Sequence, residues 1–158
     1  MSPWQTLADA LIDEDRRLRR KLITCPRALR ERRGPRGSLS LKEILGHIAF
    51  WDDFTVRFFT ARLDPTRRGP ERPVDFDALS RQAIADARLR PFGEVLAGYL
   101  EATGALVGFI ANHWDRLGEQ ERGDFWVPLK HRRHHRIELE QAMAELAGRN
   151  SAGMAAEA

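Results

Sequence analysis

Apolar residues recur at steps of three, four and seven along most of this chain, which is the spacing of an amphipathic α-helix. In residues 3–24 this stripe consists of Trp4, Leu7, Leu11, Leu18 and Leu22. Ser2 and Pro3 suit the start of a helix, and Pro26 disfavours helical geometry at the residue before it. We therefore expect a first helix that ends near Thr24.

The same pattern and its breaks predict three further long helices and one shorter helix. SLKE at residues 40–43 is a capping box, in which a serine hydroxyl and a glutamate three residues later satisfy the first amides of a helix. DPTRRGPERP contains three prolines in ten residues and ends that helix. The expected bounds are 41–63, 91–117 and 128–148 for the long helices, with a shorter helix after Asp75 and turns at GEQERGD.

No segment of useful length alternates apolar and polar residues, so the chain is expected to be all-α. Four amphipathic helices bury their stripes best as a four-helix bundle. The long stretch between the second and third principal helices permits a crossover connection, which carries the extra short helix. We expect a single domain over residues 1–147 and a small, polar, flexible tail over residues 148–158.

Three of the five histidines lie within five residues, in HRRHH at 131–135. They are either ligands in the protein interior or part of a basic patch. Extending the apolar stripe of the last helix backwards from Leu139 leads to His135 and then to His131, so both imidazoles are expected to point into the bundle. His134 falls on the polar face with Glu138 and is expected to face solvent.

His47 lies among large apolar residues of the second long helix, one turn before Trp51. Two histidines four residues apart and a third from a facing helix make a three-nitrogen metal site with one open position, which is typical of catalytic metal sites. We therefore predict that His47, His131 and His135 bind a metal ion. The alternative is that each imidazole is a hydrogen-bonded core residue without a metal.

The residues near His47 suggest further parts of a site. Trp51 is expected to line the pocket. Asp52 leans toward the interior and is a candidate catalytic base, metal-site partner or fourth ligand, whereas Asp53 should point outward; a solvated helix edge is the alternative for this pair. The Arg-rich loop at residues 30–36 precedes the helix, and we expect it near the mouth of the site, where it would attract an anionic substrate.

These residues resemble a known superfamily. SLKEILGHIAFWDDF, around His47, resembles the start of the second helix of the DinB-like (YfiT-like) metalloenzymes, and KHRRHHRIELEQAM resembles their last helix. DFDALSRQAIADARLRPFGEVL is similar to the ClbS/DfsB branch. The resemblance covers roughly residues 4–147, with the three phrases in the family's order.

The resemblance implies a four-helix bundle, often dimeric, with a divalent metal such as zinc or nickel on His47, His131 and His135. Activities implied by the resemblance are those of thiol-dependent transferases and isomerases, which use a low-molecular-weight thiol, and self-protection against reactive electrophiles. We therefore expect a thiol-dependent transferase or a hydrolase that acts on a small electrophilic molecule in detoxification or self-protection, with such a thiol as a second cofactor. Leu39 replaces a frequent tryptophan and Asp77 a frequent asparagine, and these departures leave the substrate open.

Composition and charge narrow the choice of binding partners and of cellular compartment. A net charge of +3 is weak evidence for a polyanionic partner, and no recognition helix or interleaved aromatic residues accompany the basic loops, so nucleic acid is a less favoured partner. No apolar run reaches the ~18 residues of a membrane span, and the N-terminus does not resemble a secretory signal. The single cysteine, Cys25, fits a reducing compartment, so we expect a cytoplasmic protein without membrane association.

Two functions of different classes follow from the sequence. The first is a metal-dependent enzyme that acts on a small molecule. The alternative is a non-catalytic bundle that sequesters an anionic ligand or nucleic acid. A metal-free protein that keeps only the fold is a third reading, because fold alone does not fix function.

Overall fold

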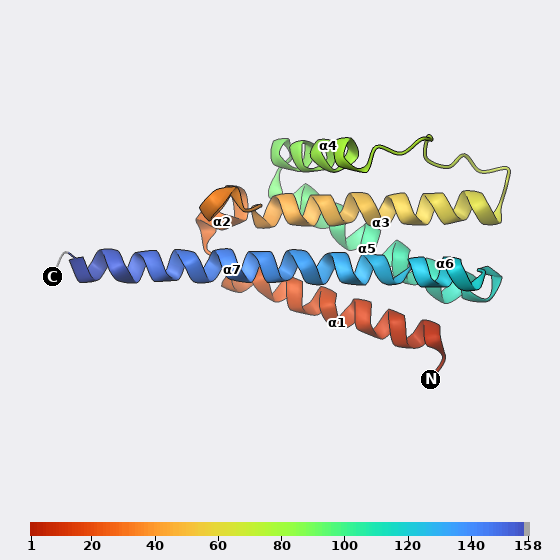
Figure 1. Cartoon of the computed structure of the whole chain (residues 1–158), viewed down its shortest axis with the longest axis horizontal. Coiled ribbons are helices and arrows are strands. Elements are labelled where there is room, and N and C mark those ends of the chain that lie inside the picture. The colour runs from red at the N-terminus through yellow and green to blue at the C-terminus, as the bar shows by residue number, and fades with distance from the viewer. Residues whose placement is uncertain (157–158) are drawn as a thin grey trace.

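The computed structural model describes residues 1–156, and its regular elements in that range are all helices, with no β-strand (Figure 1). The long helices are α1 (Pro3–Thr24), α3 (Leu41–Leu63), α5 (Phe92–His113) and α7 (Trp126–Ala156). The shorter helices are α2 (Arg27–Glu31), α4 (Phe76–Leu89) and α6 (Glu119–Asp124), with 3₁₀ turns η1 (Pro35–Gly37) and η2 (Trp114–Arg116). The prediction of an all-α chain is confirmed for the described residues.

Local sequence signals explain most of the helix ends. The Ser40 hydroxyl accepts from the Glu43 amide at 3.1 Å, and the Glu43 carboxylate accepts from the Ser40 amide at 2.9 Å, so the predicted capping box starts α3. Asp75 caps α4 by accepting from the Ala78 amide at 2.9 Å. The predicted bounds of the first two long helices, 3–24 and 41–63, are confirmed.

The structure corrects three other bounds. The helix expected to reach Leu117 ends at His113 and continues as η2. The predicted turns at GEQERGD form α6, because the Glu121 carboxylate accepts from the Gly118 amide at 2.9 Å and so caps that helix. The last helix begins at Trp126 and runs to Ala156 instead of ending at Gly148, since no proline follows and a single glycine costs only about 1 kcal/mol in a helix. Residues 157–158 of the predicted tail lie outside the described range.

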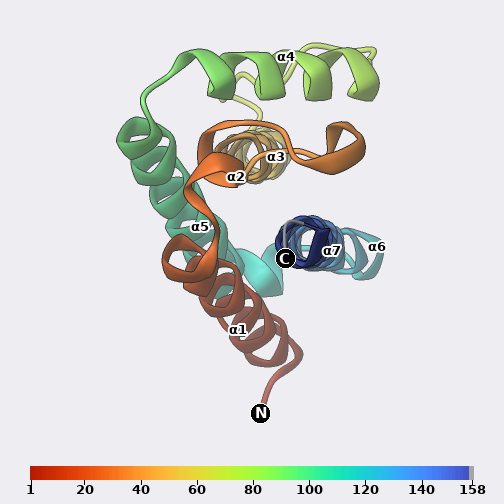
Figure 2. The same cartoon turned by 90° about the vertical axis from the view of Figure 1, so that its left-hand side faces the viewer.

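The four long helices contact one another in a closed order: α1 packs on α7, α7 on α3, α3 on α5, and α5 on α1 (Figure 2). The loop at residues 64–75 and α4 carry the chain back along the outer side of α3, so α3 and α5 run in the same direction (Figure 1). Figure 2 shows that α4 and α7 lie on opposite sides of α3. The expected crossover between the second and third long helices is therefore present.

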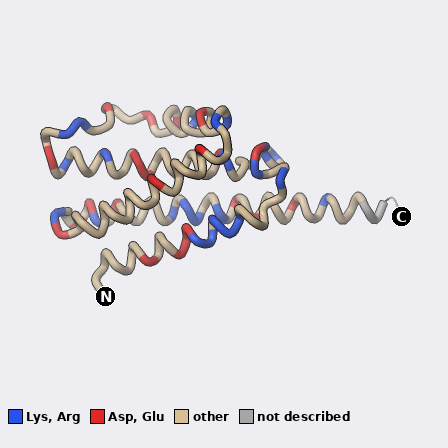
Figure 3. Tube along the Cα trace, turned by 180° about the vertical axis from the view of Figure 1, so that it is seen from behind, with Lys and Arg blue, Asp and Glu red and all other residues tan. Residues whose placement is uncertain are grey.

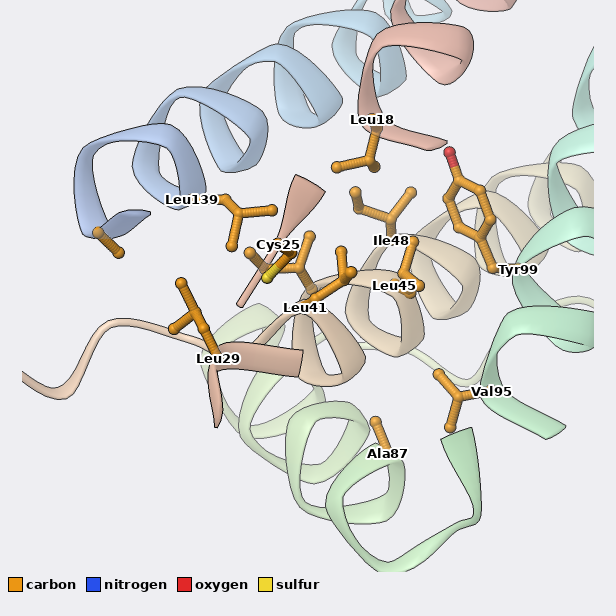
Figure 4. Packing of buried hydrophobic residues seen from close by; sticks show 12 residues of the cluster. Leu18, Cys25, Leu29, Leu41, Leu45, Ile48, Ala87, Val95, Tyr99 and Leu139 are labelled. Carbon is orange, nitrogen blue, oxygen red and sulfur yellow. The ribbon is translucent and has the colours of Figure 1, made fainter. Parts of the chain in front are cut away.

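Buried side chains from several helices meet in one part of the core (Figure 4). Leu18 of α1, Leu45 and Ile48 of α3 and Tyr99 of α5 are each fully buried there. Burying one such aliphatic side chain contributes about 1.5–3 kcal/mol, so these contacts hold α3 in place. Cys25 lies in the same cluster, and burial raises the pKa of its thiol.

The contact between α3 and α4 depends on Gly46. A Cβ at this position would clash with the side chain of Ala87, so only glycine allows the two helices to approach this closely. α4 therefore covers the side of α3 that faces away from α7.

The segment Phe92–Arg116 is long and apolar enough to cross a membrane by length and composition alone. In the structure this segment packs against α3 and α1, and its residues Val95, Tyr99 and Leu106 are completely buried. A core helix of a helical domain passes the same test, so the absence of membrane association stays a prediction.

Candidate metal centre and adjoining clefts

Three imidazoles from α3 and α7 meet between those helices. The Nε2 atom of His131 lies 3.0 Å from Nε2 of His47 and 2.9 Å from Nε2 of His135. His47 and His135 are buried and His131 is half-buried. These are the three residues that the helical periodicity directs inward, and the structure brings them together in one cluster.

His134 has the opposite orientation. Its side chain is 65% exposed and its Nε2 lies 3.2 Å from Glu138. The division of HRRHH into two inward histidines and one outward histidine follows from the 3.6-residue period of α7. His134, His135 and Glu138 also form a group of neighbouring ligand atoms, but that group lies largely at the surface.

Glu138 fixes the tautomer of the His135 imidazole. Its Oε2 lies 2.8 Å from Nδ1 of His135, and a carboxylate only accepts, so the imidazole proton is assigned to Nδ1. The Nε2 atom of His135 then carries a lone pair that points at the other two imidazoles. The sequence predicted that Glu138 lies on a solvent-exposed polar face, and its side chain is 44% exposed. Its contact with His135, three residues away on the same helix, was not predicted.

Hydrogen bonds alone satisfy this cluster poorly. Three Nε2 atoms that face one another share at most two hydrogen bonds, and each bond needs a proton on one of them. In addition, Nδ1 of His47 is buried and has no hydrogen-bond partner among the described residues. A single cation would accept a lone pair from all three Nε2 atoms at once, which is the arrangement of a three-histidine metal site.

Burial keeps these histidines uncharged. It lowers the pKa of His47 to about 4 and that of His131 to about 3, and the neighbouring imidazoles act in the same direction. Burial also lowers the pKa of His135, although Glu138 opposes that effect. Neutral imidazole is the form that binds metal ions, so the cluster is in the ligating form at neutral pH.

The spacing of the nitrogens fits a small divalent cation after a slight adjustment. Zinc–nitrogen bonds of about 2.0–2.1 Å in tetrahedral geometry place ligand nitrogens about 3.3 Å apart. The observed separations of 3.0 and 2.9 Å are a few tenths of an ångström shorter. A small outward rotation of the rings would therefore admit the ion, with one coordination position left for another molecule.

Asp52 lies beside this cluster but is engaged elsewhere. It is 1% exposed, and both of its carboxylate oxygens accept from the guanidinium of Arg132, which is completely buried. Arg132 also donates to the Thr103 hydroxyl at 2.9 Å. Burial raises the pKa of Asp52 to about 6, even with Arg132 beside it, so the carboxylate is charged at neutral pH. Asp52 is not among the ligand atoms that cluster with the histidines.

A cleft of about 1180 Å³ opens next to His131, between α3, α4 and the first turns of α7. Trp51, the predicted pocket residue, lines it, and its indole donates to the Ser80 hydroxyl at 3.2 Å. Most of the remaining lining side chains are apolar. The periodicity placed Trp51 correctly but gave no sign of this volume, because much of the wall comes from residues 72–76 and from α7.

A second, smaller cleft of about 310 Å³ lies on the other side of the cluster. His135 and Glu138 line it together with η1, including Arg36. Arg36 forms an ion pair with Glu145 and is largely exposed. One residue of the Arg-rich loop at 30–36 therefore reaches the neighbourhood of the histidines, as expected for a loop near the mouth of the site.

Comparison of the chain with protein-family models, with curated proteins and with solved structures found no significant match. The resemblance to the DinB-like metalloenzymes rests on the three phrases quoted above and stays a prediction.

Proposed function

We propose that this chain is a metal-dependent enzyme built on a four-helix bundle of the DinB-like type, with a divalent cation bound by His47, His131 and His135. The observation that carries the proposal is the convergence of three uncharged Nε2 atoms, from two helices, beside a large apolar cleft. Zinc or nickel suits imidazole ligands, and three ligands leave a position open for a reacting molecule.

The surrounding residues support such a site in distinct ways. Glu138 would hold the His135 ring through its Nδ1–H, a contact that fixes ring orientation in metal sites. The ion pair between Asp52 and Arg132 joins α3 to α7 next to the histidines and would keep their spacing constant. A bound divalent cation supplies Lewis acidity, which lowers the pKa of a bound water or thiol so that a nucleophile exists at neutral pH.

The substrate class proposed is a small electrophilic molecule, and the reaction is a thiol-dependent transfer or a hydrolysis. The large cleft would hold the electrophile, and the smaller polar cleft beside His135 and Glu138 would admit a hydrophilic second reactant such as a low-molecular-weight thiol or water. Detoxification or self-protection in the cytoplasm is the corresponding biological role, and a homodimer is the expected assembly.

Sequestration of nucleic acid by a non-catalytic bundle is the competing function. Figure 3 shows Lys and Arg interspersed with Asp and Glu along α1 and α7. Several of these cations are paired: Arg19 with Asp15, and Lys21 and Arg136 with Glu140. Pairing reduces the positive charge available to phosphates, so the enzyme proposal is favoured.

Elemental analysis of protein purified without a histidine tag tests the proposal. We expect about one zinc or nickel ion per chain, lost in His135→Ala and retained in His134→Ala, because only the first residue contributes a ligand. His134 is a matched control: it is the adjacent residue on the same helix, with the same side chain, facing solvent. Equal metal content in the two variants, or none in the wild type, would contradict the proposal.

Turnover is tested separately with small thiols and with epoxide- or cyclopropane-type electrophiles. Metal-loaded wild-type protein should consume a member of this panel, and the chelator-treated protein should not. DNA binding that falls with salt and survives loss of all three inward histidines, together with no turnover, would instead support the sequestering function.

A further inference from the structure

The large cleft has a chemical character that the metal proposal does not explain. Its walls are formed mainly by aromatic and aliphatic side chains, among them Trp51, Phe54, Phe58, Phe76, Val127 and Pro128. Phe76 and Val127 are each 61% exposed, although large apolar residues are usually covered. Exposed apolar surface of this kind in a concave site favours a ligand that covers it.

The aromatic side chains already form a stacked surface. The rings of Trp51 and Phe76 stack with centroids 5.5 Å apart and planes 23° from parallel. Phe54 and Phe58 stack at 6.4 Å and 12°. Flat rings in offset stacks present their faces to a further ring, so a planar aromatic ligand fits this wall better than a branched aliphatic one. The volume of about 1180 Å³ also exceeds that of typical small-ligand pockets, which span about 300–1,000 Å³.

Two positively charged side chains lie along this apolar lining. The Arg72 guanidinium carbon lies 4.6 Å from the centroid of the Phe58 ring, and Lys130 lines the cleft from α7. Neither side chain forms an ion pair within residues 1–156, whereas Asp52, on the same wall, is neutralised by Arg132. Asp124 is the one other carboxylate of the lining.

The contact with Phe58 leaves hydrogen-bond donors of Arg72 free. A guanidinium has five N–H donors, and a cation–π contact does not occupy all of them, so donors remain available to an anion. A carboxylate or sulfonate accepts two parallel N–H bonds from such a group. Phe58 thus contacts the side chain, and its donors have no hydrogen-bond partner in the part of the chain that the structure describes.

From these observations we infer that the cleft binds an aromatic molecule of one or more fused or linked rings that carries a single acidic group, with the rings on the Trp51–Phe76 wall and the acidic group on Arg72. The inference deepens the proposed function by giving the substrate class, and it rests on that function only for what happens to the ligand afterwards. Binding itself needs no metal.

Two fluorescent probes of almost the same shape test the inference. The anionic probe is 1-anilinonaphthalene-8-sulfonate, and the uncharged probe is N-phenyl-1-naphthylamine, which lacks the sulfonate. We expect saturable binding of both at one site per chain, with the anionic probe bound about tenfold more tightly, a difference of about 1.4 kcal/mol. Equal affinities would overturn the assignment of an acidic group, and no saturable binding of either probe would overturn the site.

Matched variants test where the acidic group and the aromatic rings of the ligand bind. Arg72→Gln should weaken the anionic probe by about five- to tenfold and leave the neutral probe within about twofold, since one charge-assisted contact in a partly open cleft is removed. Arg68→Gln, in the same loop and outside the lining, makes the same charge change and should affect neither probe. If the two variants behave alike, the assignment of Arg72 is wrong.

The apolar part is tested with Val127→Asp, which puts a carboxylate on the exposed wall of the cleft and should weaken both probes by at least about tenfold. Ile137→Asp is its control on the same helix, 41% exposed and outside the cleft. Unchanged binding in Val127→Asp would overturn the site.

The titrations are run with protein as purified and after chelator treatment. Probe binding by a protein that contains no metal would refute the proposed function and leave this inference standing. Metal content without saturable probe binding would refute this inference and leave the proposed function standing.

Discussion

Replacing Asp52 by asparagine is the sharpest test of what holds α3 and α7 together. The substitution keeps the shape of the side chain but removes the charge that both donor groups of Arg132 contact. Arg132 is completely buried, and it also donates to the neutral Thr103 hydroxyl. The guanidinium would therefore remain charged in the interior without a directly bonded counter-charge, which is the costly case for a buried ion pair.

Breaking a buried pair in this way costs about 3–5 kcal/mol. A domain has a total stability of about 5–15 kcal/mol, so the variant should fold but with a much reduced margin. At a urea slope of about 2 kcal/mol per molar, the unfolding midpoint should fall by about 1.5–2.5 M. The measurement is equilibrium unfolding in urea, followed by the helical circular-dichroism signal, with wild type and variant at the same pH and salt.

Asp53→Asn is the matched control. It makes the same change at the next residue, where the carboxylate is 58% exposed and pairs with Arg57 four residues along the helix. An exposed pair of this kind contributes about 0.3–0.5 kcal/mol, so the midpoint should barely move. A second variant, Asp52→Leu with Arg132→Met, removes both charges and should recover most of the lost stability, because no unpaired charge remains.

Equal midpoints for Asp52→Asn and Asp53→Asn would refute this account of the ion pair. If Asp52→Asn also abolished turnover of a substrate while unfolding like the wild type, the catalytic role predicted for Asp52 from the sequence would be supported instead. A destabilised variant with metal content and turnover retained at low temperature would assign Asp52 to structure.

Three further predictions address other parts of the molecule. Gly46→Ala should lower the free energy of unfolding by at least about 1 kcal/mol because its Cβ clashes with α4, whereas Gly104→Ala, with open space around it in α5, should raise it by about 0.5–1 kcal/mol; thermal unfolding of the two variants compares them directly. Ser40→Ala removes the hydroxyl that caps α3 and should cost about 0.5–2 kcal/mol, also in thermal unfolding. In metal-free protein the folded-state pKa values of His47 and His131 lie below their usual value of 6.5, so the unfolded chain binds protons first as the pH falls. These histidines should therefore lower stability as the pH falls from about 6.5 toward pH 4, whereas Asp52, whose folded pKa is raised to about 6, acts in the opposite direction. Urea midpoints across that range should show a smaller loss of stability with falling pH in His131→Asn than in the wild type; an identical pH dependence in that variant would contradict the assignment.

Periodicity was sufficient to place the histidines, because each lies on an amphipathic stripe whose inward side is fixed by neighbours such as Leu139. It did not single out Arg132 as a core residue. Seven residues back from Leu139 is a core position, so the signal was present, but arginine is rarely buried unless paired. Its partner, Asp52, lies 80 residues away in the sequence. A single sequence does not show such a pairing.

The clefts were beyond prediction for a different reason. Trp51 could be directed inward from its place on α3, but the space beside it depends on where residues 72–76 settle after the proline-rich loop. The contact between Glu138 and His135 is local, and an i,i+3 search along the last helix would have found it. Local helical geometry could therefore be predicted from the sequence, whereas the long-range packing of loops could not.

The two histidines of α7 and the single histidine of α3 are separated by 84 residues at their closest pair. Translation runs from the N-terminus, so His47 emerges from the ribosome 84 residues before His131, and only one of the three imidazoles is available to the nascent chain over that interval. An ion captured earlier would have a single nitrogen to bind. At the proposed metal site, binding of the ion would therefore wait for α7, and in the cell a metal-loaded population would consist of molecules whose synthesis had passed His135.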